Sequence, residues 1–116
     1  MVPGPVQHAA IAALADDDHV DVQRDLYHER LALMAEVMRG RGLDVAMPEG
    51  GFYLWVPAPD GDAWALTRWL AEHGGALVSP GEFYGEAGAG HIRIALVAPT
   101  DRLRLVADRL ASAPAF

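Results

Sequence analysis

The sequence contains no cysteine and no lysine among its 116 residues. Without cysteine the chain can form neither a disulfide scaffold nor a cysteine-type zinc site, and it has no thiol nucleophile. The redox compartment therefore cannot be inferred from thiol usage. All nine basic residues are arginines, which leaves no side chain with a primary amine.

Positive charge is also scarce. Nine basic residues against sixteen acidic ones give a formal net charge of −7, which opposes binding to nucleic acid because that binding relies on lysine and arginine neutralising phosphates. The first six residues lack the basic and apolar regions of a signal peptide, and no charge-free apolar run is long enough to span a bilayer. We therefore expect a soluble cytoplasmic protein that binds neither nucleic acid nor a membrane.

The sequence does contain enough apolar residues for a core. Hydrophobic residues make up 52% of the chain and charged residues only 22%. A chain of this length and composition buries a modest core in one compact unit. We therefore predict a single domain over residues 1–116.

The first third of the chain is patterned for two helices. Residues 5–15 are rich in alanine and begin with Pro5, which fits the first turn of a helix because that position needs no N–H donor. A long helix is predicted over residues 16–42, since apolar residues recur at helical spacing between aspartates that can cap its start and glycines that end it. We expect residues 1–15 to be a connecting helix that docks against another surface.

The remaining residues, 43–116, mix short strand patterns with helical ones. The clearest strand is the aromatic-rich run from Phe52 to Val56, and a final helix with one apolar face follows Pro99. Shorter strands are predicted at residues 43–47, 76–78 and 92–97, with a helix from Asp60 or Asp62 to the glycine pair at residues 74–75. This order predicts an α+β fold with a small, mostly antiparallel sheet of three to four strands, covered by helices on one face.

Arg93 stands out because it lies in the middle of a predicted strand, between Ile92 and Ile94, directly after a glycine-rich loop. Its guanidinium is a rigid fork that matches a carboxylate with two hydrogen bonds, so Arg93 is a candidate carboxylate clamp. The alternative is a structural ion pair or an outward-facing strand residue. Alternation alone favours that alternative, since a strand sends every second side chain to solvent.

Other motifs of enzymatic sites are missing. The five histidines lack the spacing of a zinc site, and the glycines of residues 81–90 are not spaced as a phosphate-binding loop. No G-x-S-x-G elbow surrounds either serine, and helix capping explains the acidic run at residues 16–18. We therefore expect no metal site in this chain.

Three segments, in this order, resemble the closing third of class I/II (fold type I) aminotransferases. They are Pro48-x-Gly50-Gly51-Phe52-Tyr53-Leu54-Trp55, then Ser79-Pro80-Gly81-x-Phe83-Tyr84-Gly85, then Gly90-His91-Ile92-Arg93-Ile94-Ala95-Leu96. The opening seven residues are similar to the segment that follows the cofactor lysine in actinobacterial N-succinyldiaminopimelate aminotransferases. The resemblance therefore covers the whole chain and identifies it as similar to the C-terminal small domain of such an enzyme.

The resemblance implies a function and a site. In that family the arginine of the G-x-x-R strand binds the substrate α-carboxylate, and Arg93 occupies its place. Gly51 and Tyr84 lie in segments that border the substrate entrance, and they are carried over as further substrate-binding candidates. The implied function is the carboxylate-binding part of a transaminase that uses pyridoxal 5′-phosphate (PLP) to move an amino group between an amino acid and a 2-oxo acid. The implied substrate is N-succinyl-LL-2,6-diaminopimelate, in lysine biosynthesis.

The sequence departs from the family pattern in its missing lysine. The family's chemistry needs a lysine amine to form a Schiff base with PLP, and the large-domain segments that hold the cofactor are not in this sequence. We therefore expect no catalytic residue, no covalently bound PLP and no amino transfer from this chain alone. The implied partners are the large domain of the same enzyme and, as is common in the family, a second copy in a homodimer.

Two other interpretations stay open. The same α+β layer would serve as a non-enzymatic association domain, in which case an exposed apolar surface along the first helix is expected. Alternatively, it is a small-ligand-binding domain that takes up a free amino acid through Arg93 without PLP.

Overall fold

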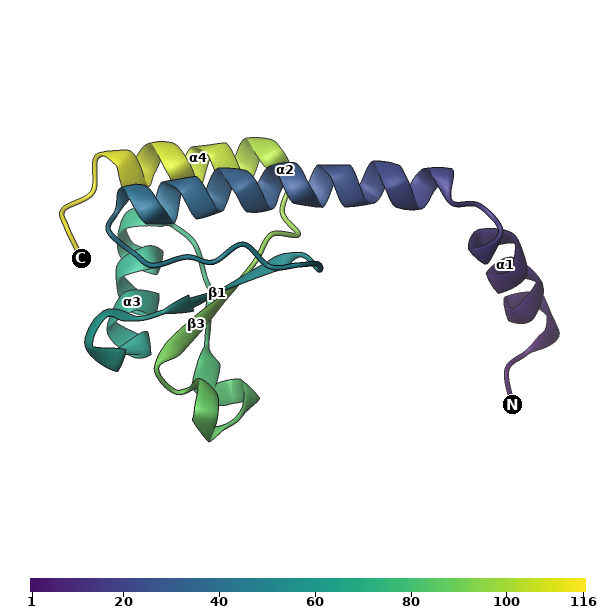
Figure 1. Ribbon diagram of the computed structural model, residues 1–116, viewed down its shortest axis with the longest axis horizontal. Coiled ribbons are helices and arrows are strands. Elements are labelled where there is room, and N and C mark those ends of the chain that lie inside the picture. Colours follow the sequence, from purple (N-terminus) through teal and green to yellow (C-terminus); the bar gives the residue numbers. More distant parts are fainter.

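The computed structural model describes the whole chain, residues 1–116. It contains four α-helices and one three-stranded sheet (Figure 1). The helices are α1 (Gly4–Leu14), α2 (Asp18–Gly40), α3 (Ala63–Trp69) and α4 (Thr100–Ala111), and the strands are β1 (Tyr53–Pro57), β2 (Ser79–Pro80) and β3 (His91–Ala95). A 3₁₀ turn precedes α3 at Pro59–Gly61, a π-helical turn extends α3 over Leu70–Gly74, and two 3₁₀ turns, Gly81–Tyr84 and Glu86–Gly88, join β2 to β3.

The predicted α+β class is confirmed. The strands are ordered β1-β3-β2, and both pairs are antiparallel. Burial alternates along the two longer strands: Leu54 and Val56 of β1 and Ile92 and Ile94 of β3 are buried beneath the helices, and the residues between them are more exposed. The sheet therefore has one face covered by helices and one open face.

A single hydrophobic core joins the covered face of the sheet to α2, α3 and α4. The C-terminal half of α2 contributes a buried stripe at helical spacing, from Leu31 to Met38, and burying such side chains stabilises the fold by about 1.5–3 kcal/mol each. No polar or charged residue is buried. The largest fully buried side chains are Met38, Leu54, Leu66, Leu70, Ile92, Leu96, Leu110 and Val56.

The segment after α2 was predicted to contain a strand at residues 43–47, and this prediction is wrong. Leu43 and Val45 are buried in alternation, as in a strand, but the segment pairs with no other strand. The guanidinium of Arg39 instead donates to the carbonyl oxygen of Val45, at 2.9 Å from Nε and 2.6 Å from Nη2. A side chain therefore holds the backbone group that a neighbouring strand would otherwise bind.

The strand predicted at residues 76–78 is displaced toward the C-terminus. Only Ser79 and Pro80 pair with β3, and Leu77 is 92% exposed. Pro80 has no N–H to donate, so a strand that contains it stays short and lies at the sheet edge. The predicted strand at residues 92–97 is shifted in the opposite direction, since β3 begins at His91 and ends at Ala95.

The predicted boundaries of the helix after β1 are confirmed. The side chain of Asp62 accepts a hydrogen bond of 2.8 Å from the backbone N–H of Ala65 and so caps the start of α3. The helical run ends at Gly75, which has a positive φ of 67°. Glycine adopts that left-handed conformation without steric strain, which is why it commonly follows a helix.

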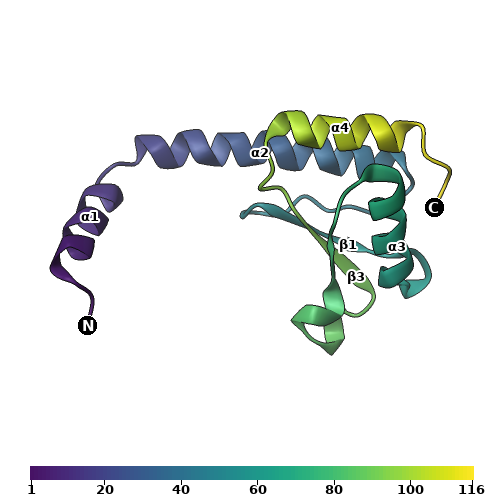
Figure 2. The same cartoon turned by 180° about the vertical axis from the view of Figure 1, so that it is seen from behind.

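The N-terminal part of the chain extends away from the core. No residue of α1 is buried, and α1 together with the first half of α2 projects from the body of the domain (Figures 1 and 2). The radius of gyration is 17.0 Å, against about 13 Å for a compact domain of this length. None of the helices is both long enough and apolar enough to cross a lipid bilayer.

Candidate functional site

Arg93 lies at the centre of the open face of the sheet. It sits midway along β3, the central strand, directly opposite Trp55 of β1 and Ser79 of β2. Its sequence neighbours Ile92 and Ile94 are buried on the helical side, so alternation directs Arg93 to the other face. Arg93 therefore points away from the core, as the alternative of an outward-facing strand residue expects. The open face to which it points is lined by aromatic rings.

Two tyrosine rings hold the guanidinium of Arg93. Its central carbon lies 4.6 Å from the ring centre of Tyr53 and 5.0 Å from that of Tyr84. One nitrogen, Nη1, donates a hydrogen bond of 2.6 Å to the Tyr84 hydroxyl, whereas Nε is shielded from solvent and has no hydrogen-bond partner. The guanidinium is thus fixed in place by aromatic faces and one hydroxyl.

No carboxylate neutralises Arg93. The ion pairs of the chain join His19 to Asp16, Arg24 to Asp21 and Asp25, and Arg104 to Glu29. The interpretation of Arg93 as a structural ion pair is therefore wrong. Its positive charge lies on the open face of the sheet without an acidic partner in this chain.

Tyr84 is electrostatically coupled to its neighbours on this face. Hydrogen bonding by the Ser79 hydroxyl and then by the Arg93 guanidinium lowers the pKa of Tyr84 from its ordinary value of 10.0. Both groups stabilise the phenolate, and the positive charge of Arg93 adds to that effect. Arg93, Tyr84 and Ser79 therefore lie together on this face.

Trp55 forms the floor of the site. Its indole is stacked on the imidazole of His91, with ring centres 5.4 Å apart and planes at 14°, and meets Tyr84 edge to face at 6.1 Å. Together with Arg93 and Tyr53, Trp55 and Tyr84 line a hollow on the open face. Tyr53 and Trp55 were not singled out from the sequence as site residues. Their i, i+2 spacing in the clearest strand was the available signal, because it places both on one face.

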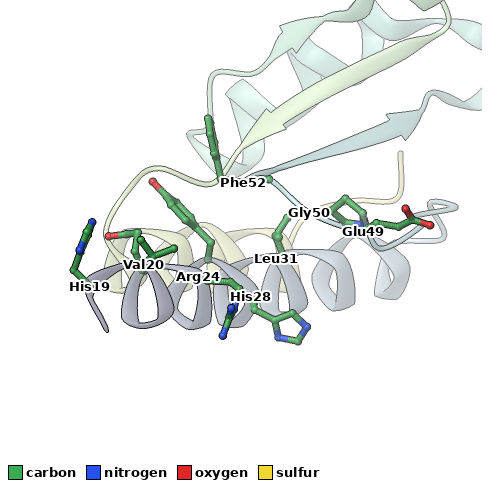
Figure 3. A pocket seen from close by; sticks show the side chains of 12 residues that line it. His19, Val20, Arg24, His28, Leu31, Glu49, Gly50 and Phe52 are labelled. Atoms are coloured by element: carbon green, nitrogen blue, oxygen red, sulfur yellow. The ribbon is translucent and has the colours of Figure 1, made fainter. Parts of the chain in front are cut away.

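Gly51 lies in a different hollow. A cavity of 470 Å³ opens between the N-terminal half of α2 and the turn that precedes β1, and Gly51 lines it. Figure 3 shows Phe52 and Gly50 on one side of this cavity and Val20 and Leu31 of α2 on the other. The structure therefore brings Arg93 and Tyr84 together but does not place Gly51 beside them.

The cavity near Gly51 offers no unpaired arginine for a carboxylate. Arg24, one of its lining residues, is already paired with Asp21 at 3.0 Å, and Tyr27 packs against Phe52 with ring centres 5.4 Å apart. In Figure 3 the side chains of Arg24 and His28 extend away from Phe52. No group of three or more histidine, aspartate or glutamate side chains in the chain could hold a metal ion. The Arg93 hollow is the stronger candidate site.

Comparison with known families identifies the family of this chain. Residues 1–110 match the family described as aminotransferase class I and II. Since the match includes nearly the whole chain, the chain belongs to the class I and II aminotransferases. The resemblance carried by the three sequence segments is confirmed at the level of the family.

Particular relatives and structures support the same assignment. The chain is 44% identical over 109 residues to a 4-dedimethylamino-4-oxo-anhydrotetracycline transaminase of Streptomyces rimosus and 38% identical over 109 residues to an LL-diaminopimelate aminotransferase of Aquifex aeolicus. A solved aminotransferase from Neisseria meningitidis superimposes with a TM-score of 0.79 at 35% identity, over 95% of this chain. Substrate-bound BacF from Bacillus subtilis superimposes with a TM-score of 0.82 at 30% identity, over 97% of this chain.

The chain corresponds to only part of these relatives. The two sequence matches include 94% and 92% of this chain but 30% and 28% of the relatives. Both structural matches include 30% of the solved chains. The chain therefore spans about a third or less of the length of the proteins it resembles.

The family depends on PLP, and the residues of this chain do not fit its covalent attachment. Attachment needs a lysine amine, and the sequence has none. Two of the arginines that could meet a phosphate are already engaged, since Arg39 donates to Val45 and Arg41 donates to the carbonyl oxygens of Ala113 and Pro114. What this chain presents on the open face of its sheet is an arginine, Arg93, held by Tyr53 and Tyr84 without an acidic partner.

Proposed function

We propose that this chain supplies the substrate-carboxylate clamp of a PLP-dependent transaminase, with Arg93 as the group that binds the α-carboxylate. The observation that carries the proposal is a guanidinium held on an open face between Tyr53 and Tyr84 with no acidic partner. Membership of the class I and II aminotransferases supports it, because their substrates are amino acids and 2-oxo acids, which share a carboxylate.

The physical basis is pre-organisation of a cation. Contact with the two tyrosine faces stabilises the guanidinium by about 0.5–2 kcal/mol each and fixes its plane before a ligand arrives. A carboxylate that binds this fork forms charge-assisted hydrogen bonds worth about 1.5–3 kcal/mol each. Little side-chain entropy is lost on binding, since Arg93 is already held in place.

The substrate is an amino acid or the corresponding 2-oxo acid, bound through Arg93. Relatives named LL-diaminopimelate aminotransferase, such as that of Aquifex aeolicus, support a diaminopimelate-type amino donor. Within that class we propose N-succinyl-LL-2,6-diaminopimelate and a role in lysine biosynthesis. The relative from Streptomyces rimosus is named for a different substrate, a 4-oxo-anhydrotetracycline, so substrates differ among these relatives.

Amino transfer needs groups that this chain does not contain. The missing lysine must come from elsewhere, and we propose that a large PLP-binding domain is the partner that supplies it. A homodimer, as the family resemblance implies, is the proposed assembly. Arg93 then acts by orienting the substrate rather than by reacting with it.

The clamp is tested by titrating the 116-residue chain with 2-oxoglutarate and following amide and arginine side-chain NMR signals. We expect saturable shifts around Arg93, which Arg93→Gln abolishes. Arg68→Gln is the matched control because Arg68 is exposed on α3, away from the hollow. Equal binding by the Arg93→Gln variant, or no saturable shift in the unmodified chain, would show that Arg93 is not a carboxylate clamp.

A second candidate function is association with another protein. The N-terminal arm, which is α1 together with the first half of α2, exposes apolar side chains. Ile11 and Leu14 are 67% and 84% accessible, and Val22 is 71% accessible. This is the exposed apolar surface expected of an association domain. Sedimentation analysis distinguishes the two functions: association through the arm is lost when Ile11 and Leu14 are changed to serine, while carboxylate binding by Arg93 is retained.

A further inference from the structure

We propose that the hydroxyl of Tyr84 is the second half of the carboxylate clamp, accepting a hydrogen bond from Arg93 and donating its own proton to one oxygen of the substrate carboxylate. This inference rests on the proposed function of Arg93 and deepens it. It assigns a specific role to a phenol hydroxyl and predicts how the site discriminates an ionised carboxylate from other groups.

A ligand can reach only one edge of the Arg93 guanidinium. Nε of Arg93 is shielded from solvent, so a carboxylate cannot approach the edge that Nε shares with one Nη. The edge formed by Nη1 and Nη2 remains, and Nη1 already donates to the Tyr84 hydroxyl at 2.6 Å. A carboxylate that binds Arg93 from the open face therefore comes within hydrogen-bonding reach of that hydroxyl.

The hydroxyl of Tyr84 still has its proton to donate. A phenol oxygen accepts hydrogen bonds and donates one proton. Because Nη1 of Arg93 occupies an acceptor position, the proton stays free to be donated. Ser79 lowers the pKa of Tyr84, as a hydrogen-bond donor to the phenol oxygen does. The phenol proton is therefore not taken by Ser79, and an ionised carboxylate, a strong acceptor, can bind it.

Packing against Trp55 orients the Tyr84 ring. The Tyr84 ring meets Trp55 edge to face at 6.1 Å and lies in the 3₁₀ turn Gly81–Tyr84. That turn packs closely on the next one, since an added Cβ at Gly88 would lie 2.5 Å from the carbonyl oxygen of Gly81. The donor position is therefore set by the fold and does not depend on the ligand.

The same contacts also fit a different role for Tyr84, in which its hydroxyl weakens carboxylate binding. If Tyr84 only occupies Nη1 of Arg93 until substrate arrives, the hydroxyl is a competitor that the carboxylate must displace. Removing the hydroxyl would then tighten carboxylate binding. The sign of the change in affinity separates a donor from a competitor.

The test compares Tyr84→Phe with the unmodified chain in NMR titrations with 2-oxoglutarate at pH 7. We expect the dissociation constant to rise about tenfold, the loss of one hydrogen bond to a charged group. Tyr27→Phe is the matched control, because it removes a hydroxyl from a ring that packs against Phe52, outside the Arg93 hollow, and it should change affinity less than twofold. Unchanged or tighter binding by Tyr84→Phe overturns the inference.

The dependence of carboxylate binding on pH is a second measurement, and a purely structural role of Tyr84 would not change it. Binding should weaken at alkaline pH as Tyr84 ionises, because the phenolate has no proton to donate and repels the carboxylate, and Tyr84→Phe should remove this dependence. The other titratable or charged groups around Tyr84 are Arg93 and His91 of β3, Tyr53 of β1, and Glu82 and Glu86 of the adjoining turns.

The variant Arg93→Gln separates the two proposals. If it abolishes binding while Tyr84→Phe leaves affinity and pH dependence unchanged, Arg93 is the clamp and the role of Tyr84 is wrong. If Arg93→Gln leaves binding intact, the proposed function itself fails. Far-UV circular dichroism and the midpoint of urea unfolding establish whether each variant remains folded. If Tyr84→Phe loses its fold, the pH profile of the unmodified chain decides: binding that weakens as pH rises through the pKa of Tyr84 supports the donor role, and a flat profile overturns it.

Discussion

Gly81 lies directly against the indole of Trp55: a Cβ added at Gly81 would be 2.8 Å from Cη2 of that ring and 2.8 Å from the carbonyl oxygen of His91. Backbone and ring thus leave no room for a side chain where the loop that carries Tyr84 leaves β2. The loop is positioned over the floor of the site because one residue there is glycine. Several consequences of such packing are measurable.

The variant Gly81→Ala should lose about 1–3 kcal/mol of unfolding free energy, the usual penalty of overpacking. It should also move Tyr84 away from Arg93, since the loop must shift to accommodate the methyl group. Gly50→Ala is the control, because an added Cβ there meets no atom within 4 Å. Urea unfolding of both variants measures the difference, and equal stability would contradict the close packing of Gly81.

Among the three tyrosines of the chain, Tyr84 has the pKa that hydrogen bonds lower. Ser79→Ala should raise it toward 10.0, and Arg93→Gln should raise it by a smaller amount, since Ser79 is the larger cause. Ultraviolet titration of the phenolate band checks both shifts. The folded pKa lies below the unfolded one, so the coupling stabilises the fold only above about pH 10 and is lost as pH falls through the folded pKa. An unchanged titration curve in both variants would exclude the coupling.

Truncating a side chain on the covered face of the sheet should lower the free energy of unfolding far more than truncating one on the N-terminal arm. Ile92 is completely buried, whereas Val22 is 71% exposed. Ile92→Ala should lower the unfolding free energy by about 2–5 kcal/mol, because it leaves a cavity in the core. Val22→Ala should change it by less than about 0.5 kcal/mol. Chemical denaturation gives both values, and similar losses would place Val22 in a packed interface.

Helix α1 should be the least protected part of the chain. It has 11 residues, none of them buried, and helices of that length are marginal in water without tertiary contacts. Its amides should exchange with solvent before those of α2 residues 31–38. Deleting residues 1–14 should leave the unfolding midpoint of the rest unchanged. Slow exchange in α1 would show that another surface covers it.

The start of α2 should depend on pH through Asp16. Its carboxylate accepts from the backbone N–H of Asp18 at 3.1 Å and lies 3.1 Å from Nδ1 of His19, and the hydrogen bond with His19 is the largest cause of its lowered pKa. The folded pKa is below the unfolded one, so protection of the first turn is present above about pH 4 and is lost as pH falls through the folded pKa. Asp16→Ala should remove this dependence, as seen in amide chemical shifts of residues 18–21. A dependence that persists in the variant would assign it to another group.

Much of the fold follows from local patterns in the sequence. The apolar stripe from Leu31 to Met38 predicted the packed half of α2, and Asp62 with Gly75 predicted the limits of the helix after β1. The segment at residues 43–47 could not be assigned correctly in this way. Its alternation matches a strand, but the carbonyl of Val45 is bound by Arg39, a contact that no periodicity reveals.

The candidate site was predictable only in part. Arg93 was identified from its place between two apolar residues of a strand, and the family segments added Tyr84. The same segments also suggested Gly51, which the structure places in a separate hollow beside α2. Tyr53 and Trp55 were missed as site residues, although the first of them contacts the guanidinium at 4.6 Å.

The sequence by itself determined the class of fold, the family and the absence of a lysine, because these depend on residue types and on spacing along the chain. Only the tertiary structure decided that Arg93 has no ion-pair partner and that Tyr53, Trp55 and Tyr84 surround it. The reason is physical: these residues meet across antiparallel strands and a folded loop. Their contacts depend on strand register and loop packing, which arise only when the helices cover the other face of the sheet.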